Sequence, residues 1–411
     1  MAGSLAAFAQ NPLVPQGGET SILASLAGDQ VWPSISLLPS AGVIAWQDNV
    51  IDKNGSGIGG SILNSSLFVG GHPFCVDKTT TGNQINPRVQ LLANGNIVFV
   101  WQSAVGGVPG IYARLATGTA KGKTAYGTNF YTIDTRVNTY TKDQQADPAV
   151  AALPDGSAII TWSSLGEDGS LWGVFARKLS AKGVASPAKE FQVNQFSQYN
   201  QRKPAVAVLP NGNFVIVWVS EQERYYNSVD VYARIFTAAG VPVTEEIPVN
   251  SGTNYCDTPD VAPLNDGGFT VVWAQKDLAV STNGWDVWGR AFGPSGMPQV
   301  ADFRINTFLF GDQYRPKIAA GPSGDLVVWT SMGQDGSREG VFGRFLQGGT
   351  SAAGSEMQIN TTTISQQLHP AVAWNGINNF LVVWSSFAGA SGIGPSGFDL
   401  YGQAYTLNTT Q

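Results

Sequence analysis

The pattern of hydrophobic and polar positions repeats along the chain as one unit, two apolar runs around a short polar turn, closed by a tryptophan. In KPAVAVLPNGNFVIVW, residues 203–218, the run that ends in Trp218 is continuously apolar instead of alternating. Continuous apolar runs of this length indicate strands that are buried on both faces. Pro210, Asn211 and Gly212 accept the backbone angles of a tight turn, so the two runs are predicted to form a buried antiparallel hairpin.

This hairpin occurs seven times along the chain. Its copies lie at residues 35–46, 89–101, 150–162, 203–218, 261–273, 318–329 and 372–384. The tryptophans that close them follow one another at intervals of about 55 to 61 residues, and they are Trp46, Trp101, Trp162, Trp218, Trp273, Trp329 and Trp384. A regular period over the whole chain is typical of a repeat architecture.

Each repeat continues past its tryptophan with a third strand, as in DVYARIF from residue 230, and a fourth, as in FQVN from residue 191. Four strands in each repeat fit one blade of a propeller, and the packing of blade against blade explains the missing alternation. A β-sandwich would not need seven copies of one unit, and a β-helix would have a much shorter period. The sequence therefore predicts an all-β fold, a seven-bladed β-propeller of four-stranded antiparallel blades.

The repeats divide the chain into an extended lead-in, residues 1–19, and a single propeller, residues 20–411. SLAAFAQ, residues 4–10, ends like a signal-peptidase site but lacks a basic region and a full apolar region, so we prefer a lead-in to a trimmed signal. The blade cores are expected near residues 31–78, 85–134, 146–194, 202–250, 257–306, 314–360 and 368–405, with residues 20–27 added to the last.

The last blade lacks a fourth strand of its own, because the chain stops soon after DLYGQAY. TSILASLAGDQ, residues 20–30, aligns with FRINTFLFGDQ, residues 303–313, which is a fourth strand followed by the next blade. We therefore expect the N-terminal strand to pair with DLYGQAY and to close the ring, with TLNTTQ, residues 406–411, as a weaker rival. The same strand could instead be donated to a neighbouring molecule, which would give self-assembly.

Composition narrows the classes of function without naming one. Charged residues make up 13% of the chain, about half the usual share, and the net charge is −6 with no Lys/Arg cluster. Such a chain lacks the positive patch that nucleic acids and anionic membranes require, and no apolar run approaches the roughly 20 residues of a membrane span. We expect no nucleic-acid partner and no membrane insertion. We associate a mainly uncharged polar surface with an extracellular or cell-surface location.

The sequence shows no signature of catalysis, of a cofactor or of a metal. It has two histidines, His72 and His369, which occupy different positions of their repeats, and none of the short hydrolase, phosphate-loop or zinc motifs. Cys75 and Cys256 fall in blades too far apart for a disulfide, so both are predicted to be free. From these absences we predict that the chain is not an enzyme and has no cofactor, catalytic residue or metal ligand.

Two polar series recur in register with the repeats. Glutamines stand three residues before the proline of six first strands, with Cys256 in the fifth repeat, and arginines recur on the third strands. We prefer structural roles for both, at blade junctions and blade edges. The glutamines are Gln30, Gln84, Gln145, Gln201, Gln313 and Gln367, and the arginines are Arg114, Arg177, Arg234, Arg290 and Arg344. The loop DKNGSG, residues 52–57, spaces oxygen side chains as calcium loops do, but the later acidic ligand is missing, and we prefer a plain turn.

The loops between second and third strands vary most in length, and variable loops on a rigid scaffold are the usual place for recognition. They include residues 220–230, 274–286 and 385–399. Exposed aromatic side chains suit sugars or protein partners, although they also pack back onto their own loops. The residues predicted to bind a surface protein or a glycan are Tyr225, Tyr226, Trp285, Arg224 and Phe387.

The unit resembles a repeat of large secreted and surface proteins of bacteria, which combines Gln-x-x-Pro, a VAxLxDGxFVVVW hairpin, a GVxGR strand and an FxVN strand. Here it reads QRKPAVAVLPNGNFVIVW from residue 201, DGSREGVFGRF from residue 335 and FQVN from residue 191. The resemblance covers nearly the whole chain and implies the propeller, but it implies no defined activity. The chain departs from WD-type repeats and from the Asp boxes of sialidases.

Two hypotheses of different classes follow. The leading one is an extracellular binding or structural module, a component of adhesion, matrix or appendages, that presents variable loops on one face. The alternative is an enzyme acting on a polysaccharide or another polymer through Asp or Glu residues of those loops. A pair of carboxylates about 5 to 9 Å apart in a deep cleft would favour the enzyme.

Overall fold

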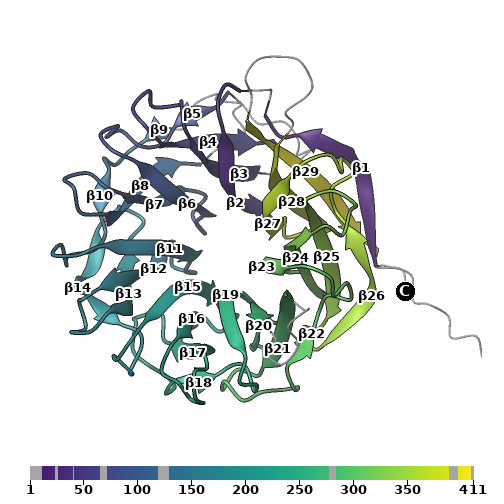
Figure 1. The fold of residues 1–411 in the computed structure, drawn as a ribbon. Coiled ribbons are helices and arrows are strands. Elements are labelled where there is room, and N and C mark those ends of the chain that lie inside the picture. The colour runs from purple at the N-terminus through teal and green to yellow at the C-terminus, as the bar shows by residue number, and fades with distance from the viewer. Residues whose placement is uncertain are drawn as a thin grey trace, which may run out of the picture.

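The computed structural model confirms the predicted fold, a closed ring of seven antiparallel sheets arranged as the blades of a propeller (Figure 1). It describes residues 12–23, 26–39, 41–64, 72–118, 129–276, 284–387 and 397–408. All the regular elements in these ranges are β-strands, and within them no helix is long and apolar enough to cross a membrane.

The strands of blades 1 to 4 follow the chain. They are β2 (Gln30–Leu38), β3 (Ala41–Asp48), β4 (Gly57–Leu63) and β5 (Phe74–Cys75); β6 (Gln84–Leu91), β7 (Ile97–Ser103), β8 (Gly110–Thr117), β9 (Asn129–Phe130) and β10 (Thr135–Arg136); β11 (Gln145–Ala152), β12 (Ala158–Leu165), β13 (Trp172–Leu179) and β14 (Ala185–Gln192); and β15 (Gln201–Val208), β16 (Phe214–Ser220), β17 (Asp230–Phe236) and β18 (Ile247–Pro248).

Blades 5 and 6 repeat this order, and blade 7 takes its last strand from the N-terminal segment. Their strands are β19 (Tyr255–Pro263), β20 (Phe269–Lys276), β21 (Trp285–Phe292) and β22 (Phe303–Arg304); β23 (Gln313–Ala320), β24 (Gly324–Met332), β25 (Glu339–Gln347) and β26 (Ser351–Gln358); and β27 (Gln367–Trp374), β28 (Asn379–Phe387), β29 (Phe398–Leu407) and β1 (Leu13–Ser21).

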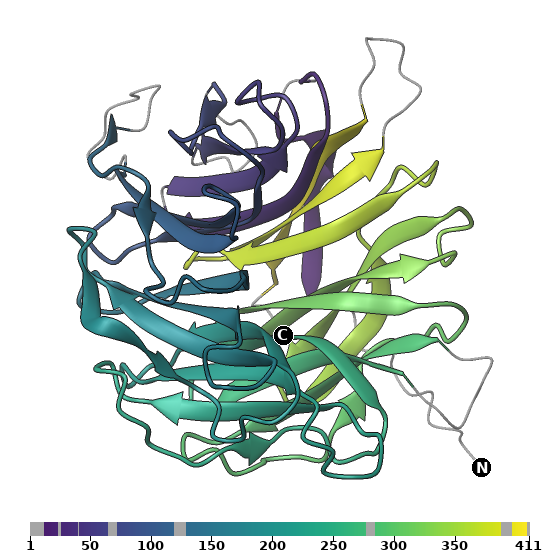
Figure 2. The ribbon, with the colours of Figure 1, turned by 60° about the vertical axis from the view of Figure 1, so that its left-hand side comes forward.

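Within each blade the first strand lies next to the axis of the ring and the last strand lies at the rim (Figure 1). Figure 2 shows the same blades fanned around the ring from another side. Because the strands are antiparallel, one face carries both the connections from rim strands to the next first strands and the loops between second and third strands. We call it the junction face. It is the face at which every first strand begins.

The core lies between blades. The seven repeated tryptophans are each at most 1% exposed, and β16 is buried at every position, so the missing alternation reports burial on both faces as predicted. Trp218 belongs to a buried cluster with Phe236 of its own blade and with Val174 and Val193 of blade 3. Every blade therefore depends on its neighbour for burial of its apolar residues.

The repeated arginines join neighbouring blades, which confirms the structural role predicted for them. Arg234 Nη1 donates a hydrogen bond of 2.9 Å to the carbonyl of Val193 at the rim of the preceding blade. The corresponding contacts are Arg114 to Val76, Arg177 to Val137, Arg290 to Val249 and Arg344 to Ile305. A planar guanidinium suits this position because it can reach a carbonyl while its stem covers apolar surface.

The repeated glutamines are buried where each first strand begins, and they satisfy backbone carbonyls of the junction loops as predicted. Gln201 Nε2 donates 2.7 Å to the carbonyl of Gln198, three residues earlier. The other contacts of this kind are Gln30 to Ala27, Gln84 to Thr81, Gln313 to Phe310 and Gln367 to Ile364, while Gln145 donates to Asp143. These amides fix the path of the chain from one blade to the next.

The N-terminal strand closes the ring in cis, as predicted, but it begins earlier than predicted. β1 pairs with β29 from Leu13 opposite Leu407 to Ser21 opposite Tyr401. Residues 13–19, which we assigned to the lead-in, therefore belong to blade 7. The register shifts between Gln16 and Thr20, where Gly17 has a φ of 69°. This bulge adds residues that an alignment of regular repeats does not anticipate. Residues 406–407 extend β29 and leave the rim position to β1.

Blade 2 departs from the regular pattern at its rim. β9 and β10 both pair with β8, so the rim is divided between two short strands. The blade core that we expected near residues 85–134 ends before this rim is complete, because residues 135–138 occupy the position of FxVN in other blades. Asn138 Oδ1 accepts a hydrogen bond of 2.8 Å from the Ile111 N–H, as its counterparts do. Cys75 and Cys256 are both free, as predicted.

Asp325 on β24 gives a test of the core that depends on pH. Its side chain is 1% exposed, and burial raises its pKa from 3.8 to about 7, although Thr270 Oγ1 donates to it at 3.1 Å. The folded chain holds this proton more tightly than the unfolded chain, so the stability contributed by Asp325 is lost as the pH rises from about 4 to 7.

We therefore expect Asp325→Asn to increase the free energy of unfolding at neutral pH by about 1 to 4 kcal/mol. The amide keeps the shape and an acceptor for Thr270 but carries no charge. Denaturant unfolding of both proteins at several pH values measures the difference, which should shrink toward pH 4. An equal difference at every pH would show that Asp325 is not protonated in the fold.

Candidate functional site

Each first strand carries a bulge next to the axis, where it begins at the junction face. The register of every first strand against the second shifts at this point, for example between Arg202 and Ala205 of β15. The residue inside the bulge precedes a proline and has a left-handed backbone, with φ from 46° to 58°. The seven residues at this position, which we call the bulge ring, are Trp32, Asn86, Asp147, Lys203, Thr258, Arg315 and His369.

The bulge ring is strained in the same way in all seven blades. A positive φ is uncommon for residues other than glycine, and a following proline adds a further restriction. Strain of this kind persists where the surrounding fold imposes it, and it is concentrated at functional sites. The backbone is the same at all seven positions while the side chain differs at each. The fold therefore holds seven different chemical groups in equivalent places around one axis.

These side chains line a cavity of about 320 Å³ in the axial channel. The residues after the seven prolines line it as well; among them Arg88, Asp260 and Lys317 are charged, whereas Ala149 and Ala205 are small. A volume of this size is at the lower end of the range for ligand pockets. The channel can therefore admit one end of a ligand, with the rest of the ligand on the junction face.

Positive charge exceeds negative charge along the cavity. Its lining contains four cationic side chains and two carboxylates, in a chain whose net charge is −6. The cationic residues are Arg88, Lys203, Arg315 and Lys317, and the acidic ones are Asp147 and Asp260. Lys203 Nζ lies 2.7 Å from Asp257, next to the bulge ring, and Lys317 Nζ lies 3.7 Å from Asp260. The channel is therefore suited to a ligand that carries negative charge.

Asp147 is a buried carboxyl of the cavity lining whose protonated form is favoured by its surroundings. Burial raises its pKa, and the nearby charges of Lys203 and Arg88 oppose this effect only in part. Ser163 Oγ lies 3.4 Å from Asp147 Oδ2 as a weak donor. Asp260 lies in a different setting, because it forms an ion pair with Lys317 and accepts a hydrogen bond of 3.1 Å from the Ile318 N–H. Two carboxyls in unlike environments therefore line one cavity.

An aromatic cluster forms the other side of the bulge ring. The Trp32 indole stacks on the His369 imidazole, with ring centres 3.7 Å apart, and the Arg315 guanidinium carbon lies 4.2 Å from the Trp32 ring. Burial, with a smaller contribution from Arg315, lowers the pKa of His369 to about 3, so the imidazole is neutral. Among the described residues, His369 Nδ1 and Thr258 Oγ1, also a member of the bulge ring, have no hydrogen-bond partner although both atoms are buried. Each therefore keeps an unused capacity for a hydrogen bond.

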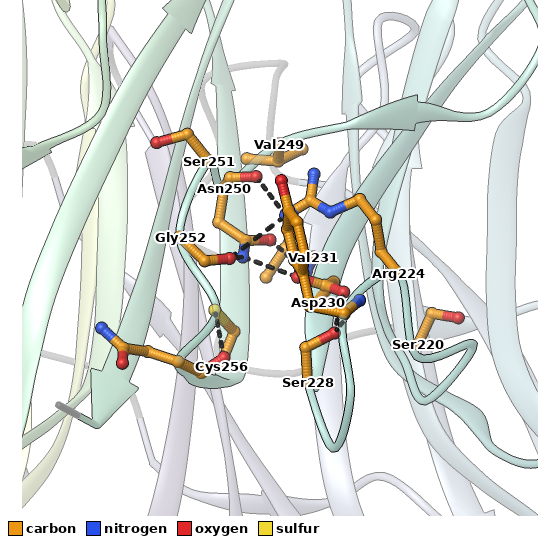
Figure 3. A network of polar contacts seen from close by, with 12 residues as sticks. Ser220, Arg224, Ser228, Asp230, Val231, Val249, Asn250, Ser251, Gly252 and Cys256 are labelled. Atoms are coloured by element: carbon orange, nitrogen blue, oxygen red, sulfur yellow. Dashed lines mark hydrogen bonds and ion pairs between the residues drawn. The ribbon is translucent and has the colours of Figure 1, made fainter. Parts of the chain in front are cut away.

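Of the residues predicted to bind, Arg224 is held in a polar network on the junction face of blade 4 (Figure 3). Its Nη2 donates to Asp230 Oδ1 at 2.9 Å and to the Asn250 carbonyl at 2.6 Å, and its guanidinium lies 5.1 Å from the Tyr225 ring centre. These contacts stabilise the loop before β17. The Tyr225 side chain is 44% exposed and that of Tyr226 is 91% exposed.

The other two predicted residues lie apart from this loop. Trp285 begins β21 in blade 5, where it is half-buried and its backbone N–H donates to Asp312 Oδ1 at 3.0 Å. Phe387 ends β28 in blade 7 and packs against Phe398, with ring centres 5.3 Å apart. Their loops include residues 277–283 and 388–396, which lie outside the described ranges. The five residues are therefore spread over three blades, and none of them lines the cavity.

A loop carboxylate of the kind predicted for an enzyme is present in Glu167, but its setting is structural. Ser164 Oγ donates to Glu167 at 2.7 Å, and burial raises the pKa of Glu167 to about 8. Gln334 takes the same place in blade 6, where it accepts from Ser331 and donates to Glu356. A protonated Glu167 can replace such a glutamine. The carboxyls that line the cavity come instead from first strands, at Asp147 and Asp260.

Among the described residues no group of three or more His, Cys, Asp or Glu side chains is arranged to hold a metal ion. The bulge ring was not predicted from the sequence, because its seven members share no residue type. One signal was available, since each ring residue directly precedes a proline that stands three residues after a repeated glutamine or, in the fifth repeat, after Cys256.

No family model matches the sequence, and no curated protein matches it. Solved structures similar to the chain include a protein of unknown function from Dyadobacter fermentans, with a TM-score of 0.54, 11% identity, and coverage of 95% of this chain and 98% of the other. An α-L-arabinanase from Penicillium chrysogenum, bound to arabinobiose, has a TM-score of 0.52 and 12% identity over 79% and 94% of the chains. An ulvan lyase of polysaccharide lyase family PL25 has a TM-score of 0.55 and 8% identity over 96% and 94%.

These similarities correct the prediction that the chain is not an enzyme. That prediction was wrong because it rested on the absence of short catalytic motifs. Solved structures that this chain resembles include a glycoside hydrolase and a polysaccharide lyase. A protein of this shape can carry an active site built from residues that are distant in sequence, and such a site leaves no short motif. At 8 to 12% identity the similarity establishes the fold alone.

Proposed function

We propose that this chain is an enzyme that cleaves a polysaccharide in its axial channel. The observation that carries the proposal is the bulge ring, which holds an acid, an imidazole, an indole and two cations at strained, equivalent positions around one cavity. The similarity to an arabinanase and to an ulvan lyase supports the substrate class. The bulge ring combines the same backbone in every blade with a different side chain in each. A rigid scaffold that positions different catalytic groups needs this combination.

The reaction that fits the lining best is hydrolysis of a glycosidic bond. Hydrolysis needs one carboxyl that gives a proton to the leaving oxygen and a second that acts as base or nucleophile. Asp147 is assigned the role of acid, because burial favours its protonated form. Asp260 is assigned the second role, because a base or nucleophile acts as a carboxylate and Lys317 places a positive charge beside this one.

The channel also limits the substrate. Its small volume favours the end of a polysaccharide chain over an internal segment, and its cationic lining favours sugar units that carry carboxylate or sulfate groups. Trp32 and His369 offer aromatic surface beside the same cavity. A location outside the cell or at its surface, where polysaccharides of this kind are degraded, agrees with the low share of charged residues, and we propose it with the function.

The test compares a channel residue with a loop residue on a panel of neutral and anionic polysaccharides, by release of new reducing ends. Lys203→Met should lower kcat/KM by at least about 10-fold on the anionic substrate, because the cation that contacts the sugar is lost. Tyr226→Ala should leave kcat/KM unchanged. Binding without cleavage, abolished by Tyr226→Ala and not by Lys203→Met, would establish the loop-based binding module instead. If no polysaccharide is bound or cleaved, the proposed function is wrong.

A further inference from the structure

Five blades carry a buried asparagine at the end of the rim strand, and it ties three elements together. The Oδ1 of each accepts a hydrogen bond of 2.7 to 2.9 Å from a backbone N–H at the start of the third strand; the five are Asn138, Asn194, Asn250, Asn306 and Asn360. The Nδ2 of each donates to the carbonyl two residues later.

Blade 3 shows the full set of acceptors around this amide. Asn194 Nδ2 lies 2.8 Å from the Phe196 carbonyl, 3.3 Å from Gln201 Oε1 and 3.4 Å from Asp168 Oδ2. Blade 6 repeats the set with the corresponding residues. The acceptors come from the junction loop, from the next blade and from the loop between second and third strands. The amide has two hydrogens for these three acceptors, so one hydrogen is shared between the two more distant oxygens.

Blade 1 has an aspartate, Asp77, in place of this asparagine. Its Oδ1 accepts a hydrogen bond of 2.7 Å from the Ile58 N–H, so the carboxyl takes the pose of the asparagines. Its Oδ2 therefore stands where the other blades place the donor Nδ2. Asp77 is 3% exposed, and its Oδ2 has no hydrogen-bond partner in the part of the chain that the structure describes.

The acceptors that this position serves in other blades are also left without a donor. Gln84, the counterpart of Gln201, is fully buried, and its Oε1 has no partner. Asp52, the counterpart of Asp168, precedes Gly57 as Asp168 precedes Gly173, and in both blades the carboxyl lies against that glycine. Asp52 Oδ2 is likewise buried without a partner. By this correspondence, the three unpaired oxygens are Asp77 Oδ2, at the position of the amide nitrogen, and the two oxygens that accept from that nitrogen in other blades.

The described groups nearby do not donate to these three oxygens. Arg114 donates to the carbonyls of Val76 and Thr132 and lies 3.8 Å from Asp134. Cys75 Sγ reaches the carbonyl and Oδ1 of Asp77, but not the three unpaired oxygens, and burial and Asp77 raise the pKa of its thiol to about 12. Unpaired buried oxygens of two carboxyls and an amide are costly unless a cation or a proton joins them.

We propose that Asp52 Oδ2, Asp77 Oδ2 and Gln84 Oε1 bind a calcium ion, with the Thr79 carbonyl, the counterpart of that of Phe196, as a further ligand. Calcium takes carboxylate, amide and carbonyl oxygens in flexible geometry and completes its shell with water. The acidic ligand missing from DKNGSG is supplied by Asp77 from the rim strand. The ion would tie the loop of blade 1 to the first strand of blade 2, as the asparagine does elsewhere.

Blade 7 provides a contrast. There Leu23 aligns with the asparagine, since TSILASLAGDQ aligns with FRINTFLFGDQ, and Gln30 Oε1 is left without a partner. Leucine supplies no carboxyl at the position of Asp77, so the described residues of this junction do not repeat the set of oxygens found in blade 1. The charge of Asp77 is what distinguishes the proposed site.

The test uses the full chain, stripped with EDTA and then given CaCl₂ or MgCl₂. Calcium should raise the Tm of the wild-type protein and give a binding isotherm in calorimetry. Asp77→Asn restores the amide of the other blades, so it should fold, show a Tm in EDTA at or above that of the wild type, and bind calcium at least about 10- to 100-fold more weakly.

Asp168→Asn in blade 3 is the matched control and should keep the calcium response of the wild type. The proposal is overturned if neither cation shifts the wild-type Tm or gives a binding signal, in which case a proton shared between Asp52 and Asp77 joins the oxygens. It is equally overturned if Asp77→Asn responds to calcium as the wild type does.

Discussion

Replacing Asp147 by asparagine should lower the rate of polysaccharide cleavage by about 100- to 10,000-fold at neutral pH, the range expected for loss of a general acid. The amide keeps the shape of the side chain and can still accept from Ser163, but it has no proton to transfer. KM should change little, because the contacts of the channel with the sugar are retained. Initial rates and KM on the substrate found in the panel measure the effect.

The pH profile gives the same assignment a second readout. An acid must be protonated to act, and burial raises the pKa of Asp147, so the wild-type rate should fall as the pH rises through that pKa. The profile of Asp147→Asn should lack this limb. A variant that loses activity but keeps the limb would show that another group is the acid.

Asp155→Asn is the matched control for this experiment. Asp155 lies in the turn between β11 and β12, at the opposite end of the hairpin that carries Asp147, where it pairs with Lys178 at 2.7 Å. The same change is thus made in the same blade, on the face away from the channel mouth. Its rate should equal that of the wild type. A comparable loss in both variants would mean that blade 3 had been damaged as a whole.

The fold could be predicted from the sequence because its determinants are repeated. Trp218 and its six counterparts lie at one position of the second strands, and burial between blades requires a large apolar side chain there. Gln201 and Arg234 likewise recur because every junction presents the same carbonyls. A residue that makes the same contact in every blade therefore recurs in nearly every repeat of the sequence. The number of repeats then gives the number of blades.

The candidate site could not be predicted in this way, because the residues at the axis differ in type from one repeat to the next. Asp147 and Lys203 occupy equivalent positions and share nothing that a repeat alignment displays. Their left-handed backbone also runs against the local preference of a residue before proline. The same holds for Asp77, where one changed residue in a repeated motif turns a donor into an acceptor. Positions at which the residue type differs between repeats therefore indicate the candidate sites better than the conserved pattern of the repeat does.

Loss of the closing strand should abolish the stable fold. A chain that lacks residues 1–23 loses Leu13, Ile22 and Leu23, all buried in blade 7, at about 1.5 to 3 kcal/mol each, besides the ladder to β29. The sum approaches the whole stability of a typical domain. We therefore expect no cooperative thermal transition for the truncated chain, and aggregation through the exposed edge of β29.

Point variants on the closing strand separate loss of packing from loss of the segment. Leu13→Asp places a charge at a position that is 4% exposed and should lower the Tm strongly, whereas Val14→Asp, at a neighbouring position that is 44% exposed, should not.

A peptide of residues 12–27 added to the truncated chain should restore the transition, since the strand binds through backbone pairs and the pockets of alternate side chains. Light scattering should show the intact chain as a monomer, because β1 pairs with β29 of its own chain. A truncated chain that melts as the intact one does would mean that the ring does not need this strand, and an intact chain that runs as an assembly and dissociates on truncation would mean that the strand is donated to a neighbour.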